Sequence, residues 1–307
     1  MIVQTKLLDK LNQILLIVLI GSLFYNCSPR QMVMNELGGL LDSFEWVYIS
    51  EDDPELVKDA FPFNLKTIDM LVKSNPDNRE LLLAAASGYA MYSFAFIMEE
   101  ADRIVVKDYN NGVILFERAK NLFNRGRAYG LRNLELTNSE IVRLLEDRPA
   151  GLYFSKTDIP ALYWTAVSIA GSISASRVDP NYVIDLPKVG WLIEQCLQLD
   201  PDWNNGALFT AMISYTMNRP DRNKNSSKLA QEYFDKSIAA SQGLDAAPYL
   251  ALAENVYVSE QNKFAFNQAL NNALAIDVNL HLENRLANII SQNRARWLLS
   301  RIDELFY

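Results

Sequence analysis

Cys196-Leu-Gln-Leu-Asp-Pro-Asp202 combines apolar residues, an Asp-Pro dipeptide and a short polar turn. Proline has no backbone N–H and disfavours the helical conformation of the residue before it, so this stretch is typical of one helix ending and the next beginning. Related phrases occur at Leu71-Val-Lys-Ser-Asn-Pro-Asp77 and Ser176-Arg-Val-Asp-Pro-Asn181, with a proline-free version at Ala273-Leu-Ala-Ile-Asp-Val-Asn279. We therefore predict a chain of consecutive helix pairs.

The phrases recur at irregular intervals. Tetratricopeptide repeats (TPRs) close each helix pair with such a phrase at a period of about 34 residues, which this chain lacks. Only 12 glycines and 11 prolines occur in 307 residues, which argues against a turn-rich β architecture, and no alternating strand pattern is found. We predict an all-α fold, an α-solenoid of stacked, degenerate TPR-like helix pairs. Because the pairs must bury their apolar faces against one another, the stack is expected to leave a groove on one side.

Capping signals and periodicity set the expected helix bounds. Asp52-Asp53-Pro54-Glu55 supplies an Asp cap, a proline in the first turn and an acid at the positive end of the helix dipole. The expected helices cover residues 54–73 with a bend at Pro62, 77–103, 112–134, 138–148, 158–177, 185–200, 203–217, 227–241, 246–258, 260–276 and 280–306. Two charge-free stretches, 81–98 and 159–176, reach the length of a membrane span. Their many small residues favour helices that neighbours cover on every face.

The N-terminus predicts export. Lys6 and Lys10 precede an uncharged run over 11–26 with an aliphatic centre, as in a secretory leader. Cys27 then resembles a bacterial lipoprotein cleavage site, although Phe, Tyr and Asn precede it where small residues are usual. We predict a lipoprotein signal peptide at 1–26, lipid attachment at Cys27, an anchor segment and first helix at 27–49, and the helical domain at 50–307. An uncleaved anchor and an ordinary leader with an incidental cysteine stay open; all three export the protein.

Composition and motifs argue against most catalytic and nucleic-acid functions. The formal net charge is -8, opposite to the basic footprint that phosphate backbones require. No phosphate-binding loop, dinucleotide fingerprint or nucleophile elbow is found, so we predict no cofactor. Cys196 is expected in the core, and His281 stands alone without a metal-ligand partner. The acid pairs Asp52-Asp53 and Glu99-Glu100 suit helix starts and solvated faces better than acid–base catalysis, so we predict no enzyme.

Aromatic and arginine residues form three groups of interest. Tyr89, Tyr92 and Phe96 share one helix face, and Tyr163-Trp164 opens the helix over 158–177. Both groups suit core packing, and both suit the lining of a cleft in which tyrosine hydroxyls orient a ligand. The third group, Arg294, Arg296 and Trp297, has arginines that pair with acids between helices or meet a carboxylate of a ligand or partner. The ligand-cleft candidates are Tyr89, Tyr92, Phe96, Tyr163, Trp164, Arg294 and Trp297.

A family resemblance spans residues 50 to 306. The stretch 50–66, which contains the Asp-Asp-Pro-Glu helix start, resembles the beginning of TatT proteins, tetratricopeptide-like lipoproteins associated with tripartite ATP-independent periplasmic (TRAP) transporters. Further matching phrases follow in order: Leu81-Leu-Leu-Ala, Gly88-Tyr89, Phe94-Ala-Phe96, Glu99-Glu-Ala-Asp102, Arg127-Ala-Tyr-Gly-Leu-Arg132, Leu162-Tyr-Trp-Thr-Ala166, Leu197-Gln-Leu-Asp200, Gly206-Ala-Leu208, Ala247-Pro-Tyr249, Arg285-Leu-Ala-Asn288 and Arg294-Ala-Arg-Trp-Leu-Leu-Ser-Arg-Ile-Asp303. Two features depart from the family: the irregular leader cysteine, and a loop at 218–227 without a glycine run.

The resemblance implies a periplasmic lipoprotein that assembles as a homotrimer. We expect its lipid anchor in the outer membrane. It would dock a TRAP-type substrate-binding protein and bind an apolar or amphipathic small molecule in a hydrophobic cleft. The membrane is contacted through the lipid anchor, and nucleic acid is not an expected partner. A structural adaptor of the cell envelope with no small-molecule ligand is the alternative function.

Overall fold

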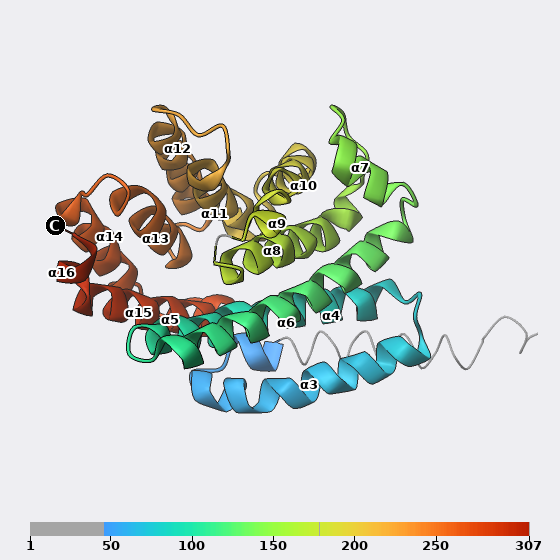
Figure 1. Cartoon of the computed structure of the whole chain (residues 1–307), viewed down its shortest axis with the longest axis horizontal. Helices are drawn as coiled ribbons and strands as arrows, with labels where there is room; N and C mark the ends of the chain where they lie inside the picture. Colours follow the sequence, from blue (N-terminus) through green and yellow to red (C-terminus); the bar gives the residue numbers. More distant parts are fainter. Residues whose placement is uncertain (1–45, 178, 307) are drawn as a thin grey trace, which may run out of the picture. The chain divides into compact units, whose positions relative to one another are not determined.

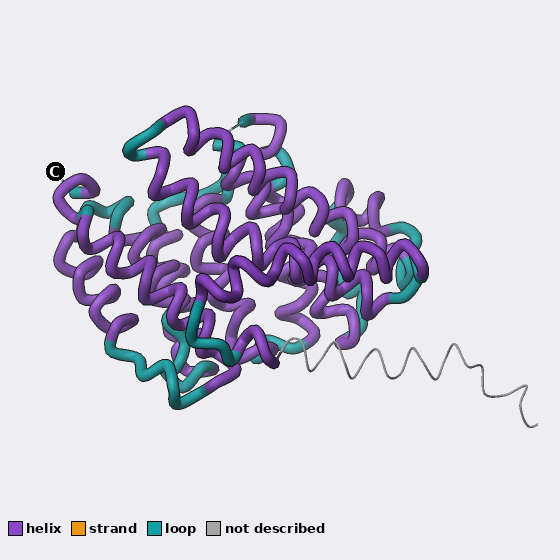
Figure 2. The backbone as a smooth tube through the Cα atoms, turned by 90° about the horizontal axis from the view of Figure 1, so that it is seen from below, coloured by secondary structure: helices purple, strands orange, loops and turns teal. Residues whose placement is uncertain are grey.

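The computed structural model describes residues 46–177 and 179–306. The chain separates into two compact units, Met1–Val47 and Tyr48–Tyr307. The predicted leader over 1–26, Cys27 and most of the segment 27–49 lie outside the described residues. In the second unit the described regular elements are helices, with no strand among them (Figure 2). This confirms the all-α prediction.

The helices lie close to their predicted bounds. The α-helices are α3 (Pro54–Ser74), α4 (Arg79–Tyr92), α5 (Glu99–Val105), α6 (Tyr109–Glu135), α7 (Ile141–Asp147), α8 (Ile159–Ala175), α9 (Pro180–Val183), α10 (Leu186–Leu199), α11 (Trp203–Asn218), α12 (Ser226–Ala240), α13 (Ala247–Leu252), α14 (Lys263–Leu274), α15 (Arg285–Ser300) and α16 (Ile302–Leu305). Short 3-10 helices, Lys156–Asp158 and Leu282–Asn284, precede α8 and α15.

The first of these helices begins as the sequence predicts. Asp53 caps α3, and its carboxylate accepts hydrogen bonds from the backbone N–H groups of Glu55 at 3.0 Å and Leu56 at 3.1 Å. Pro54 occupies the first turn, where its missing N–H has no helical acceptor in any case. Pro62 lies inside the helix, which continues to Ser74.

Two π-helical segments are a difference from the prediction. The helix expected over 77–103 contains η1 (Ser93–Met98) between α4 and α5, and η3 (Ala253–Tyr257) follows α13 directly. A π turn widens the helix by one residue and changes the direction in which the next side chains point. The apolar spacing of the sequence does not reveal such a segment, because it is a local shift within an otherwise continuous helix.

Small residues bring α4, α6 and α8 close together. A Cβ atom added at Gly126 of α6 would lie 2.7 Å from the Ser168 hydroxyl of α8 and 3.1 Å from the Ala86 carbonyl of α4. A Cβ added at Gly130 would lie only 2.2 Å from the Thr165 hydroxyl oxygen of α8. Because α10 also packs on α8, the faces of this charge-free helix that carry Thr165 and Ser168 are buried, whereas a stripe that includes Tyr163, Trp164 and Val167 stays partly accessible. The prediction of coverage on every face is thus met only in part.

One helical stretch has the length and composition of a membrane span. Among the described residues, the continuous helix Arg79–Val105 meets both criteria, and 61% of its most apolar window is buried inside the fold. Burial of this extent is also found in core helices that never enter a membrane.

The helices of the second unit pack in chain order and then return to the start. In succession, α3 packs on α4, α4 on α6, α6 on α8, α8 on α10, α10 on α11, α11 on α12 and α13, α13 on α14, and α14 on α15. The last long helix, α15, then contacts α3 and runs beside α5 (Figure 1). Its Leu286 and Ile290 pack against a core cluster that contains Val57 and Phe61 of α3.

The close approach of α6 and α8 predicts a specific clash. Gly130→Ala should lower the melting temperature by about 2–4 °C, because overpacking costs about 1–3 kcal/mol while alanine returns only about 1 kcal/mol of helix propensity. In a Thr165→Ala background the same change should destabilise less, since the crowded hydroxyl is gone and the nearest remaining atom, the Cβ of residue 165, lies 3.2 Å away. Thermal unfolding followed by circular dichroism measures both; an equal loss in the two backgrounds would place the clash elsewhere.

Candidate functional site

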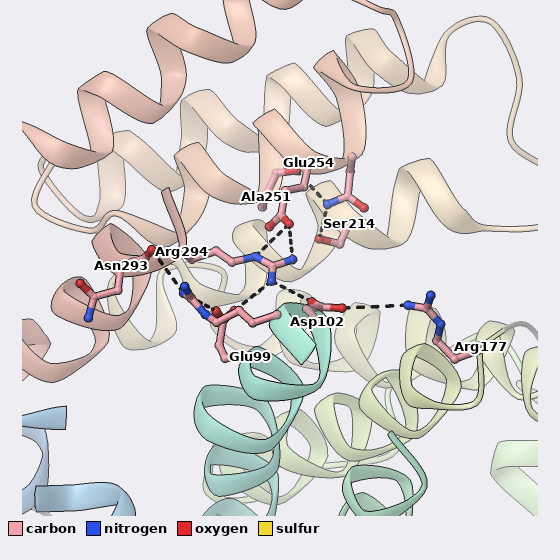
Figure 3. Close-up of polar contacts among 10 residues, drawn as sticks. Glu99, Asp102, Arg177, Ser214, Ala251, Glu254, Asn293 and Arg294 are labelled. Carbon is pink, nitrogen blue, oxygen red and sulfur yellow. Dashed lines mark hydrogen bonds and ion pairs between the residues drawn. The ribbon is translucent and has the colours of Figure 1, made fainter. Parts of the chain in front are cut away.

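The guanidinium of Arg294 lies at the meeting point of three helical segments. It reaches Glu254 of η3 at 2.6 Å, Asp102 of α5 at 2.7 Å and Glu99 of α5 at 3.3 Å (Figure 3). The Arg294 side chain is only 15% exposed, whereas an unpaired guanidinium would be costly to bury. Arg294 therefore holds α15 against both α5 and the segment after α13.

Two of the carboxylates that contact Arg294 lie at π-helical segments. Glu99 is the first residue after η1, and Glu254 is the second residue of η3. In both places the widened turn redirects the acid relative to a regular α-helix. π turns are rare in proteins, and those that occur are often found at functional sites. Two of them beside one arginine therefore make this cluster a candidate functional site.

Two further arginines extend the cluster. Arg103 pairs with Glu99 at 3.3 Å and donates to the Asn293 carbonyl of α15 at 3.4 Å, and Arg177 approaches Asp102 at 4.0 Å from the end of α8. The charged residues of this cluster therefore come from α5, η3, α15 and the loop after α8, which contributes Arg177. We call its central part, Arg294 with Glu99, Asp102 and Glu254, the arginine clasp.

The charges of the clasp shift one another's protonation. Burial opposes the charge on Arg294, but the carboxylates of Glu254, Glu99 and Asp102 outweigh it and raise the pKa of the guanidinium. Burial raises the pKa of the Glu99 carboxyl above its ordinary value, although Arg294 and Arg103 act in the opposite direction. The clasp thus holds a permanently charged arginine beside one carboxylate that is poorly solvated.

Trp297 lies one helical turn from Arg294, and its ring makes cation–π contacts with three arginines. The guanidinium carbons of Arg294, Arg301 and Arg103 lie 4.7, 4.8 and 5.4 Å from the ring centroid. Each such cation–π contact contributes on the order of 0.5–1 kcal/mol at partly exposed sites. Of the predicted cleft residues, the structure brings Arg294 and Trp297 together in this way.

The first aromatic group lies in the core between α3, α4 and α6. Tyr89, Tyr92 and Phe96 are 1%, 5% and 8% exposed. The Tyr89 hydroxyl donates to Asp69 at 2.8 Å, and the Tyr92 ring stacks on Phe61 with centroids 5.9 Å apart. These contacts fulfil the core-packing interpretation; a part in lining a cleft stays a prediction for these three residues.

The second aromatic group is half-buried. Tyr163 and Trp164 of α8 each keep part of their surface accessible, and the Tyr163 ring lies 5.1 Å from Trp164 and 5.0 Å from Trp203. Within the described chain, the Tyr163 hydroxyl makes no hydrogen bond. It is not one of the buried unpaired polar atoms, which are Ser168 Oγ, Thr216 Oγ1 and Arg285 Nε. Burial raises its pKa, and so does the nearby carboxylate of Asp245.

Asp245 is a site residue that the sequence reasoning missed. It precedes α13 and is half-buried, and one carboxylate oxygen accepts the backbone N–H of Ala247 at 2.9 Å. Burial raises the pKa of its carboxyl. The sequence offers no signal that Asp245 lies near Tyr163, because the two residues come from different helix pairs.

The remaining sequence candidates have ordinary structural surroundings. Cys196 is buried, and burial raises the pKa of its thiol to about 12. His281 is exposed and pairs with Glu283 at 2.9 Å. Arg296 is exposed and contacts Asn293 on its own helix. The acid pairs face cations: Asp52 meets Arg285, and Glu100 meets Lys58 at 3.2 Å. No group of His, Cys, Asp and Glu that would suit a metal occurs in the part of the chain that the structure describes.

Removal of the central arginine should loosen the clasp. Arg294→Met leaves three partly buried carboxylates without their shared cation, so we expect a loss of about 3 kcal/mol, a fall of roughly 6–12 °C in melting temperature. Arg296→Met is the matched control on the same helix and should change the melting temperature by less than about 2 °C. Equal effects of the two substitutions would contradict the central role of Arg294.

The protonation of Glu99 predicts a pH dependence. A carboxyl whose pKa is raised by folding contributes unfavourably above that pKa, and the penalty is relieved as the pH falls. Glu99→Gln mimics the protonated acid, so its melting temperature should exceed that of the wild type near pH 7, with the gap closing toward about pH 4.5. A variant less stable than the wild type near pH 7 would mean that the arginines outweigh burial.

Comparison with known proteins identifies the family of this chain. Its sequence matches the family described as TRAP transporter T-component over residues 50–306, which is nearly the whole second unit. A curated protein of Treponema pallidum (strain Nichols), described as uncharacterized, is 26% identical over 269 residues, covering 86% of this chain and 83% of its own length. The family match covers all the stretches in which the sequence resembles TatT proteins, from the Asp53 helix cap to the helix that carries Arg294. The chain belongs to the TRAP transporter T-component family, and its function is that of an accessory component of a TRAP transport system.

Proposed function

We propose that this protein is a periplasmic accessory of a TRAP-type transporter that binds an apolar or amphipathic molecule and docks the substrate-binding protein. The observation that carries the proposal is the family match across the helical unit, residues 50–306. Transport components of this class act on small molecules, and the chain contains aromatic residues suited to hold one.

The group of Tyr163, Trp164, Trp203 and Asp245 supports the ligand part of the proposal. Three aromatic rings offer apolar surface, and the Tyr163 hydroxyl makes no hydrogen bond to residues 46–177 and 179–306. This hydroxyl can therefore bind a polar group of a ligand without breaking a hydrogen bond within the protein. A molecule with an apolar body and a hydrogen-bonding end, such as a fatty acid, fits this combination.

The remaining parts of the proposal concern assembly and place. The sequential packing of the helices supports a solenoid of degenerate TPR-like pairs, whose neighbours bury one another's faces. A lipid on Cys27 would anchor the protein to the outer membrane, and the resemblance to TatT proteins implies a homotrimer. The substrate-binding protein would dock on the helical unit.

Deletion of one hydroxyl tests the ligand site. Tyr163→Phe removes an oxygen that makes no hydrogen bond to the described protein, so the fold should keep its melting temperature. Loss of a single hydrogen bond of about 0.5–1.5 kcal/mol should weaken the binding of a dansyl-labelled fatty acid about three- to tenfold, measured by fluorescence titration. Tyr153→Phe is the control, because the Tyr153 hydroxyl already donates to the Ala150 carbonyl at 3.0 Å on the surface.

Native mass spectrometry of the gently purified protein separates the proposal from its alternative. A carrier should retain an apolar compound, which extraction into organic solvent then releases. A protein that captures the TRAP substrate-binding protein but neither retains such a compound nor binds the dansyl-labelled acid would be a structural adaptor.

A further inference from the structure

The outer face of α3 carries an apolar stripe that no described part of the helical unit covers. Leu56, Phe63 and Met70 are 56%, 80% and 64% exposed and stand seven residues apart. Ala60 and Thr67 lie between them, so the spacing alternates between four and three residues. This spacing places side chains in a single seam on a helix and is the pattern by which two helices pack together. We call these five residues the α3 seam.

The polar groups along the seam are already satisfied within the helix. The Thr67 hydroxyl donates to the Phe63 carbonyl at 3.1 Å, and at the end of the stripe the Ser74 hydroxyl donates to the Met70 carbonyl at 3.1 Å. Both hydroxyl donors would therefore keep their acceptors if the seam were covered. The penalty for burying an unpaired polar group does not arise. The seam presents methyl, methylene and aromatic groups to its surroundings.

The charges beside the seam follow a pattern with opposite ends. On one flank, Glu55 and Asp59 occupy the N-terminal half of α3, whereas Lys66 and Lys73 occupy the C-terminal half. When two identical helices pack antiparallel about a two-fold axis, the same flank of each lies on the same side of the interface. The acidic half of one flank then faces the basic half of the other. In a parallel two-fold pair this flank would instead face the opposite flank of the partner, where Asn64 and Leu71 offer no charge to pair with.

The apolar residues of the seam match in the same antiparallel arrangement as the charges. With the axis at Phe63, Leu56 of one copy faces Met70 of the other, and the two Phe63 rings meet at the centre. The same register places Asp59 near Lys66 of the second copy and Glu55 near Lys73 of the second copy. Apolar and charged positions thus agree on one register, as an isologous contact requires.

We propose that the α3 seam is the docking surface for the α3 seam of a second copy of this chain, packed antiparallel. The position of α3 permits this, because it is the first helix of the packed series and its opposite face covers α4 (Figure 1). At about 1.5 Å per residue, a helix of 21 residues is about 32 Å long. Such a helix pair is smaller than a standard interface, so a weak association that depends on protein concentration is expected. A two-fold contact of this kind is distinct from a three-fold assembly.

Cysteine cross-linking in cells tests the register. In the full-length protein, Phe63→Cys places two thiols at the two-fold axis, so a disulfide-linked dimer should appear on a non-reducing gel of oxidised membranes. Phe264→Cys is the matched control, because Phe264 of α14 is also 80% exposed and lies outside the seam. The wild type, whose Cys196 is buried, gives the background. No dimer above the Phe264→Cys control would overturn the proposal.

Charge reversal tests the partner and its direction. In sedimentation of the full-length protein in mild detergent, Glu55→Lys and Lys73→Glu should each weaken dimerisation about three- to tenfold, and Phe63→Lys should abolish it. The double variant Glu55→Lys with Lys73→Glu should restore it, because exchange keeps the two antiparallel flanks complementary. A sedimenting mass that does not rise with concentration, or a rise that Phe63→Lys leaves unchanged, would refute a second copy as the occupant. A double variant weaker than both single variants would refute the antiparallel register.

Discussion

The guanidinium of Arg294 contacts carboxylates from α5 and from η3, and this contact fixes the last long helix, α15, to α5. A partly buried arginine is tolerated only where its partners are held in place, because the desolvation penalty exceeds any single ion pair. The acids Glu99, Asp102 and Glu254 must therefore occupy defined positions at the same time. That requirement couples helices that are 192 residues apart in sequence.

The close packing of α4, α6 and α8 makes this return of the chain possible. A Cβ atom at Gly126 would crowd both neighbours of α6, so α4 and α8 approach α6 closely at this point. Where no large side chain separates the helices, as at Gly126 and Gly130, little freedom is left in their relative positions. The position of α5 at the far end of α4 is then set by packing, and the clasp joins α15 to a fixed partner. Stability and geometry at the clasp thus depend on glycines that lie outside it.

Much of the fold was predictable because its signals are local. Caps such as Asp53 and the Asp-Pro phrase near Asp200 act over one or two turns, and the sequence displays them directly. The small residues of α8 likewise predict burial, which the structure confirms at Thr165 and Ser168. Other features depend on contacts between distant segments or on backbone geometry that residue type does not determine. The π-helical segments, the Arg294–Glu254 pair and the position of Asp245 beside Tyr163 are of this kind.

Two tyrosines show how hydrogen bonding separates residues that look equivalent in the sequence. Tyr89 and Tyr163 both lie on apolar helices beside other aromatic residues, and both were candidates to orient a ligand. The Tyr89 hydroxyl donates to Asp69, which also accepts from Tyr129 at 2.8 Å, so its hydrogen-bonding capacity serves the packing of α3 on α4 and α6. Burial and the carboxylate of Asp245 raise the pKa of Tyr163 instead, and its hydroxyl makes no hydrogen bond within the described chain. Because the fold does not use the hydrogen-bonding capacity of this hydroxyl, Tyr163 is the better place to look for a bound molecule.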